Sequence, residues 1–117
     1  MDLDGIRTYC LQKPGVEESL PFGPDALVFK TGNKIFAILS LGSERSWINL
    51  KCEPAYALEL REVHSEIIPG YHMNKKHWNT IFLDGGLKSV FLKKLIDHSY
   101  DQVLSPRPGK IKSTGEL

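Results

Sequence analysis

The chain has 117 residues, 41% of them hydrophobic and 25% charged, which suits a single globular domain with one core and excludes a disordered or fibrous protein. Fifteen Lys and Arg against fourteen Asp and Glu give a formal net charge of +1, which argues against a strongly basic nucleic-acid binder. No apolar run reaches the length of a membrane span and the N-terminus is acidic, so we expect a cytoplasmic protein with no membrane partner.

The first half of the chain reads as one helix followed by strands. Apolar residues at helical spacing predict a helix that ends at Pro14-Gly15. Strands are then predicted over residues 16–20, 26–30, 34–41 and 46–52, and a Gly-Asn turn joins the second to the third. In the last of these strands apolar and polar side chains alternate, which predicts one packed face and one solvent face. The solvent face carries Trp47, Asn49 and Lys51.

The second half contains two predicted helices and the last strand. Pro54 suits the first turn of a helix that ends near residue 64, a strand is predicted over 78–83, and a final helix over 87–104. Residues 1–104 form one predicted domain, and residues 105–117 have too little apolar content to pack, which predicts a flexible basic tail. This order of elements predicts an α+β fold, in which an antiparallel sheet carries the helices on one face.

Four blocks of the sequence recur together in a known family. They are Pro21-Phe22-Gly23-Pro24, Asn49-Leu50-Lys51-Cys52, the segment from Pro69 to Thr80, and Asp97-His98-Ser99-Tyr100. In this order they resemble the MmcQ/YjbR family of small bacterial proteins, and the resemblance covers nearly the whole chain. It implies a twisted antiparallel sheet over helices, with two protruding hairpins called a double wing. It also implies a DNA-binding role, which has been proposed for the family from its shape.

The segment from Pro69 to Thr80 is the densest polar and aromatic stretch of the chain. Lysines neutralise phosphates, indole rings stack on bases and amides read base edges, so this composition favours a nucleic-acid interface on the exposed sheet face and the hairpins. The candidate interface residues are Lys34, Trp47, Asn49, Lys51, Lys75, Lys76, His77, Trp78 and Asn79.

A different class of partner fits the same residues. Trp and Tyr dominate the energetics of many interfaces, so the same Trp, Tyr and His surface is also consistent with a module that binds a protein or a small ligand. The nearly neutral net charge favours this alternative. The basic residues Arg107, Lys110 and Lys112 of the predicted tail would add a flexible arm to a nucleic-acid interface.

The sequence favours a binding protein that is not an enzyme. No nucleophile elbow or phosphate loop is present, and the side chains of Asp97 and His98 diverge on a helix. His72 and His77 are five residues apart, which fits no common metal-ligand spacing, and Cys10 and Cys52 read as buried thiols. We therefore expect no catalytic residues, metal or cofactor, and a monomeric chain.

Three further side-chain roles are predicted. We expect Tyr71 to anchor its loop on the core and Gly70 to supply an unusual backbone angle. We also expect the His98 ring to donate a hydrogen bond to a backbone carbonyl.

Overall fold

The structure, a computed structural model, describes residues 1–104, and the predicted basic tail with Arg107, Lys110 and Lys112 lies outside the described residues. Three helices and six strands follow one another: α1 (Leu3–Leu11), β1 (Glu17–Ser19), β2 (Ala26–Thr31), β3 (Lys34–Ser40), β4 (Trp47–Lys51), α2 (Pro54–Val63), β5 (Ile67–Pro69), β6 (Trp78–Phe82) and α3 (Ser89–Leu104). The strands form one antiparallel sheet in the order β1-β2-β3-β4-β6-β5.

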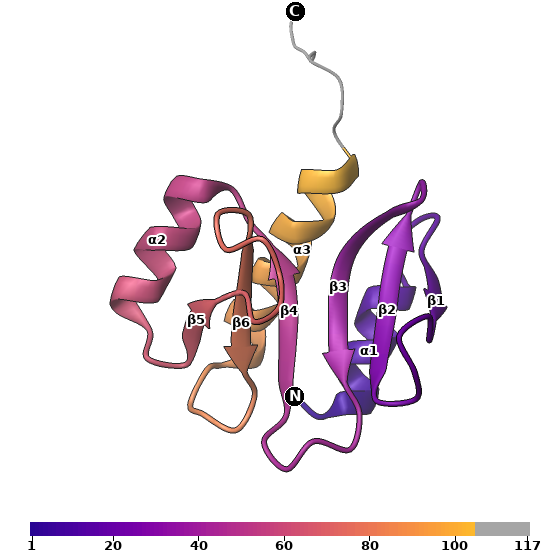
Figure 1. Cartoon of the computed structure of the whole chain (residues 1–117), viewed down its shortest axis with the longest axis horizontal. Coiled ribbons are helices and arrows are strands. Elements are labelled where there is room, and N and C mark those ends of the chain that lie inside the picture. The colour runs from indigo at the N-terminus through magenta and orange to yellow at the C-terminus, as the bar shows by residue number, and fades with distance from the viewer. Residues whose placement is uncertain (105–117) are drawn as a thin grey trace, which may run out of the picture.

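All three helices pack on the same face of this sheet, so the predicted α+β class is confirmed. In Figure 1 α1 and α3 lie behind the strands, and α2 flanks β5 at the edge of the sheet. Side chains from the helices and the sheet share one core, whose largest fully buried members include Phe29, Phe36, Ile48, Leu50 and Ile96. We call the opposite side of the sheet the open face. No helix within residues 1–104 is both long and apolar enough to cross a lipid bilayer.

The first two helices begin at acidic caps that the sequence supplies. The Asp2 carboxylate accepts a hydrogen bond from the Gly5 backbone N–H at 2.8 Å, and the Glu53 carboxylate accepts from the backbone N–H groups of Ala55 and Tyr56. These contacts satisfy N–H groups that have no partner inside the helix, and a negative charge also suits the helix dipole. Both helix starts are therefore fixed locally.

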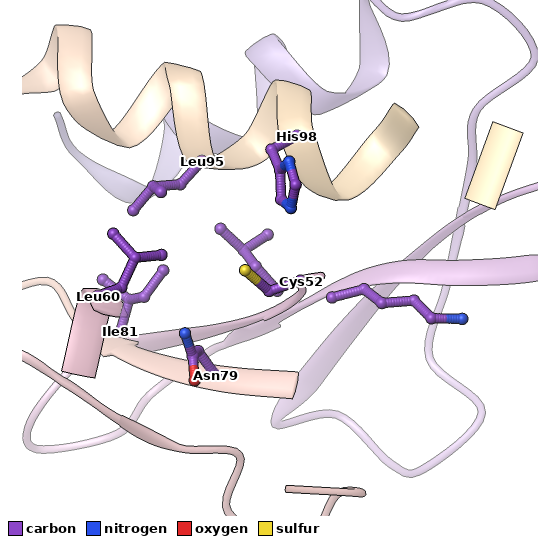
Figure 2. A pocket seen from close by; sticks show the side chains of 8 residues that line it. Cys52, Leu60, Asn79, Ile81, Leu95 and His98 are labelled. Carbon is purple, nitrogen blue, oxygen red and sulfur yellow. The ribbon is translucent and has the colours of Figure 1, made fainter. Parts of the chain in front are cut away.

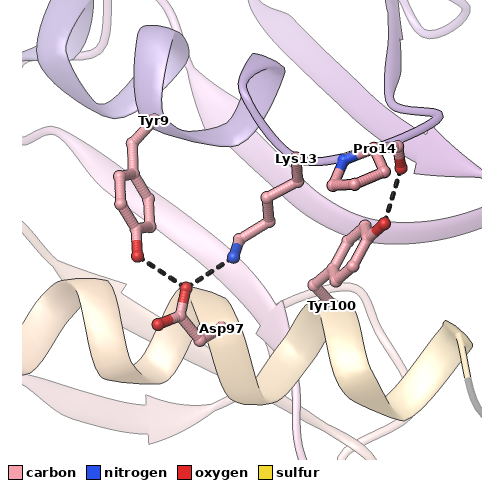
Figure 3. Close-up of polar contacts among 5 residues, drawn as sticks. All are labelled: Tyr9, Lys13, Pro14, Asp97 and Tyr100. Carbon is pink, nitrogen blue, oxygen red and sulfur yellow. Dashed lines mark hydrogen bonds and ion pairs between the residues drawn. The ribbon is translucent and has the colours of Figure 1, made fainter.

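A polar clamp joins α1 to α3 on the side of the helices away from the sheet (Figure 3). The Asp97 carboxylate accepts hydrogen bonds from the Tyr9 hydroxyl at 2.7 Å and the Lys13 ammonium at 2.5 Å, and the Tyr100 hydroxyl donates to the Pro14 carbonyl. Burial alone raises the pKa of Asp97, but the hydrogen bonds from Lys13 and Tyr9 outweigh it, so this pKa lies below its ordinary value.

Helix α3 also separates two strands of the sheet. β3 and β4 pair only from Ala37 to Leu39, opposite Leu50 to Ile48. At the next position the buried Ser99 hydroxyl accepts from the Lys51 N–H at 2.8 Å and donates to the Phe36 carbonyl at 2.5 Å. In Figure 1 the two strands diverge at this end and α3 is visible between them.

Candidate nucleic-acid interface

The open face is built mainly from β4 and β6. Trp47, Asn49 and Lys51 of β4 pair with Phe82, Thr80 and Trp78 of β6, and paired residues of antiparallel strands point to the same face. The predicted common face of Trp47, Asn49 and Lys51 is therefore observed, and the register adds Trp78 to it.

Two loops rise over the open face and leave a groove between them. Residues 20–25 connect β1 to β2 on one side, and residues 70–77 connect β5 to β6 on the other. The groove encloses about 410 Å³, and its walls combine apolar and aromatic side chains (Phe22, Ala26, Ile38, Trp47, Tyr71 and Met73) with two polar ones (Asn49 and His72). We call it the aromatic groove. A neighbouring hollow of about 170 Å³ lies over Ile68, Thr80 and Phe82 and shares Trp47 and Tyr71 with the groove.

Asn49 is the most deeply buried polar residue of the aromatic groove, with 3% of its surface exposed. Its side-chain oxygen accepts a hydrogen bond from the Thr80 hydroxyl at 2.5 Å, and the same hydroxyl oxygen accepts from the Tyr71 backbone N–H at 2.9 Å. The Asn49 side-chain N–H groups have no partner among the described residues. A buried amide donor with no partner is costly, which makes it a candidate contact for a bound molecule.

Arg61 of α2 holds the 70–77 loop in place. Its guanidinium donates to the side-chain oxygen of Asn79 at 2.6 Å and to the backbone carbonyls of Trp78 and Lys75. The Lys75 ammonium in turn donates to the Gly70 carbonyl at 3.3 Å. Helix α2 therefore fixes the loop that forms one wall of the aromatic groove.

The backbone of this loop differs from the prediction. Gly70 has no positive φ; a Cβ at this position would lie 2.7 Å from the Cβ of Trp78, so glycine is required by close packing. The positive φ, 60°, belongs to His72. The prediction for Tyr71 is also wrong, since 63% of this residue is exposed and its side chain lines the groove instead of packing on the core.

Two predicted base contacts are wrong. Asn79 pairs with Leu50, so it points to the helix side, where it is 1% exposed and its amide also donates to the Ala57 carbonyl. Figure 2 shows Asn79 among side chains that lie between the sheet and α3. Trp78 does point to the open face, but only 9% of its surface is exposed, so its ring is not available for stacking.

The predicted cationic residues do not all share the open face. The register between β2 and β3 shifts at Lys30, and Lys34 then pairs with Thr31, which is buried near Gly15 on the helix side. Lys34 therefore lies at its predicted hairpin but on the helix side, away from the open face. Lys51 remains on the open face, partly buried.

The three loop residues of the predicted interface, Lys75, Lys76 and His77, differ in how far they are exposed to solvent. Lys75 and Lys76 are exposed at the end of the 70–77 loop, while His77 is partly buried and its carbonyl accepts from the Cys52 N–H at 2.8 Å. None of Lys51, Lys75 and Lys76 forms an ion pair with another described residue.

Cys52 and His98 are the closest approach to a catalytic pair. Both line a cavity of about 10 Å³ between α3 and the sheet, which is too small for a substrate (Figure 2). Burial raises the pKa of the Cys52 thiol to about 11, so it is protonated at neutral pH. His98 Nε2 accepts a hydrogen bond from the Glu53 N–H at 3.1 Å, so the prediction that this ring donates to a carbonyl is wrong. Within residues 1–104, no three His, Cys, Asp or Glu side chains gather in a way that would hold a metal ion.

Sequence reasoning missed most of the groove. Phe22 was visible as an aromatic residue between two prolines, which keeps it out of a strand and leaves 67% of it exposed. Ile38 of the groove and Thr80, which contacts Asn49 from below, carried no signal of their own, because the role of an ordinary strand residue is seen only when the register is known.

Comparison with known proteins places the chain in a family. A family model described as YjbR matches residues 11–102. The chain is 35% identical over 108 residues to the uncharacterised protein YjbR of Escherichia coli strain K12, which covers 92% of each chain. It is 40% identical over 98 residues to the uncharacterised protein YbdF of Escherichia coli O157:H7, which covers 84% of this chain and 80% of the relative.

Solved structures agree. The crystal structure of the Deinococcus radiodurans protein DR2400 matches with a TM-score of 0.85 and 35% identity, over 92% of this chain and 82% of that one. A crystal structure of a Pseudomonas syringae protein matches with a TM-score of 0.76 and 29% identity, over 87% and 98% of the two chains. The chain therefore belongs to the YjbR family, as its sequence blocks and its fold both indicate.

Proposed function

We propose that this protein binds nucleic acid as an unpaired strand, without catalysing a reaction on it. The observation that carries the proposal is the aromatic groove beside lysines of the open face and the 70–77 loop. Trp47 and Tyr71 offer aromatic surface, Lys51 offers positive charge on the open face, and Lys76 offers it on the loop. Proteins that bind single strands combine these two elements, because every base has a face that can stack and every nucleotide has a phosphate.

The recessed groove favours an unpaired strand over a duplex. A base inside a duplex is stacked between its neighbours and cannot enter a recess flanked by the 20–25 and 70–77 loops without being unpaired. Trp78 and Asn79 no longer contribute to the interface, and Lys34 contributes at most from the far side of its hairpin. The proposed interface is therefore smaller than the sequence suggested. This size agrees with the net charge of +1.

A salt titration with a fluorescent twelve-residue oligothymidylate tests the proposal. We expect micromolar binding at low salt. For a single strand, the slope of log K against log salt changes by about 0.7 for each phosphate contact that is lost. Lys51→Ala/Lys76→Ala should therefore reduce the slope by about 1.4. Lys88→Ala/Lys94→Ala removes the same charge from exposed positions at and before α3 and should leave the slope nearly unchanged.

Two results would refute the proposal. One is the absence of binding to the oligothymidylate even at about 20 mM salt, where the electrostatic contribution is largest. The other is an equal loss of binding in both double variants, which would mean that total charge alone determines the affinity.

A second candidate function is the binding of a free small molecule in the aromatic groove. The volume of the groove, about 410 Å³, favours it, because small-molecule sites enclose roughly 300–1,000 Å³ and combine apolar walls with a few polar groups. Under this function the lysine variants would leave binding unaffected, whereas substitution of Trp47 would abolish it.

A further inference from the structure

We infer that the aromatic groove selects a planar ring that carries a carbonyl group, and that thymine and uracil are the bases that fit it. The inference rests on the proposed function and specifies which base of an unpaired strand enters the groove. A free pyrimidine nucleoside offers the same ring, so the experiment below separates the two sources.

The selectivity comes from the side-chain amide of Asn49. Its N–H groups are unpartnered among the described residues and belong to a side chain with 3% exposure in the floor of the groove. A ring carbonyl that accepts from this N–H would remove the cost of a buried donor without a partner. A ring that presents only a donor at the same place would add a second unsatisfied group.

The hydrogen bond between Thr80 and Asn49 disfavours the usual pairing with adenine. Asparagine reads adenine with its oxygen and its N–H groups together. Here the Asn49 oxygen is occupied by the Thr80 hydroxyl at 2.5 Å, and the backbone N–H of Tyr71 fixes that hydroxyl from the other side. The two unpartnered N–H groups are therefore the main hydrogen-bonding groups that Asn49 offers a ligand, and a carbonyl oxygen on a base matches them.

The walls of the groove favour a flat, uncharged ring. Trp47, Tyr71 and Phe22 supply aromatic surface, and Ile38 and Met73 supply aliphatic surface that suits the methyl group of thymine. None of the lining residues is a Lys, Arg, Asp or Glu, so the groove offers a charged ring none of these residues as an ion-pair partner.

The spacing along β4 connects the ring to a phosphate contact. Trp47, Asn49 and Lys51 lie on one face of the strand, about 6.6 Å apart in turn, because side chains on one face repeat every second residue. A nucleotide whose base contacts Asn49 therefore has its backbone within reach of Lys51. The aromatic groove and the lysines act as one site in this arrangement.

The experiment compares twelve-residue oligothymidylate and oligoadenylate with free thymidine. Binding is measured by fluorescence anisotropy for the oligonucleotides and by the NMR signals of the Asn49 side-chain amide for all three. We expect oligothymidylate to bind at least about tenfold more tightly than oligoadenylate, in line with one well-made base contact. Thymidine at millimolar concentration should shift the Asn49 amide signals.

Two variants test the contacts directly. Asn49→Asp keeps an acceptor for Thr80 but replaces the free N–H groups by oxygen, so oligothymidylate binding should fall at least about tenfold. Trp47→Ala removes a partly exposed ring and should weaken binding about 5- to 150-fold, while Trp47→Phe should retain most of it. Thermal unfolding of each variant verifies that it is folded under the assay conditions.

The outcomes separate the inference from the proposed function. Binding of oligothymidylate that is equal to that of oligoadenylate, or is unchanged by Asn49→Asp, overturns the inference while nucleic-acid binding stands. Thymidine that shifts the Asn49 signals when neither oligonucleotide binds refutes the proposed function and supports the groove as a site for a free nucleoside. Failure of all three probes overturns both.

Discussion

Replacement of Arg61 by methionine should destabilise the protein more than loss of any other arginine within residues 1–104. Arg61 links α2 to β6 and to the 70–77 loop through three hydrogen bonds: one to the Asn79 side chain and one to the Trp78 carbonyl, both in β6, and one to the Lys75 carbonyl in the loop. Methionine has a similar length and is apolar, so it can occupy the same space but cannot donate. The substitution therefore tests the hydrogen bonds more than the packing.

The magnitude follows from how deeply each acceptor is buried. The Asn79 side chain is 1% exposed, so water cannot replace the lost donor, and an unsatisfied buried acceptor costs about 1–3 kcal/mol. The two carbonyls lie at the edge of the loop, where water restores part of the loss. We expect a total loss of about 3 kcal/mol in the free energy of unfolding, or a fall of about 1.5–2 M in the urea midpoint at a typical slope.

Urea denaturation followed by tryptophan fluorescence measures this loss. Arg7→Met is the matched control, because Arg7 pairs with Glu18 at the surface and such pairs contribute little to stability. In a protein that already carries Asn79→Leu, Arg61→Met should reduce the free energy of unfolding by less than it does in the wild type. The reason is that no polar side chain at position 79 is then left without a hydrogen-bond partner. A midpoint for Arg61→Met that equals that of Arg7→Met would refute the assigned role of Arg61.

Three further predictions concern the packing of the domain. Because the folded pKa of Asp97 is below its ordinary value, Asp97→Asn should cost about 1 kcal/mol at pH 7, and this difference should vanish as the pH falls below about 4 and through the folded pKa in urea titrations. Gly70→Ala should lower the melting temperature by several degrees, because its Cβ would meet Trp78, whereas Gly86→Ala, which meets nothing within 4 Å, should not. Ser99→Ala should cost about 2 kcal/mol in chemical denaturation, because the buried Phe36 carbonyl and the partly buried Lys51 N–H both lose their partner, while an unchanged midpoint would contradict the bridging role of the Ser99 hydroxyl.

The fold could be predicted from the sequence because its signals are local. Pro54 at the start of α2, the Gly-Asn turn between β2 and β3 and the alternation along β4 each specify their own element. The prediction that Trp47, Asn49 and Lys51 lie on one face was correct for the same reason, because side chains along a strand alternate between the two faces.

The site could be predicted only in part, because its geometry depends on contacts between distant segments. The same period of two places Asn79 on the helix side, but this follows only once its partner Leu50 is known. Lys34 lies on the helix side because of a register shift that has no sequence signature here. The burial of Trp78 depends on the loop that α2 holds through Arg61, which is a tertiary effect.

The separation of β3 from β4 has a mechanical consequence for ligand binding. Phe22 and Ile38 belong to the half of the sheet that contains β1 to β3, while Asn49 and Tyr71 belong to the other half, so the two walls of the groove stand on different halves. Three residue pairs, the Ser99 hydroxyl and a hydrogen bond from the Trp47 N–H to the Ser40 hydroxyl join these halves, so the seam between β3 and β4 is a line along which the sheet can flex. Flexing along it changes the width of the groove. A ligand that contacts both walls would restrict motion between the two halves of the sheet. We therefore expect the Lys51 amide hydrogen to exchange more slowly with solvent when the site is occupied.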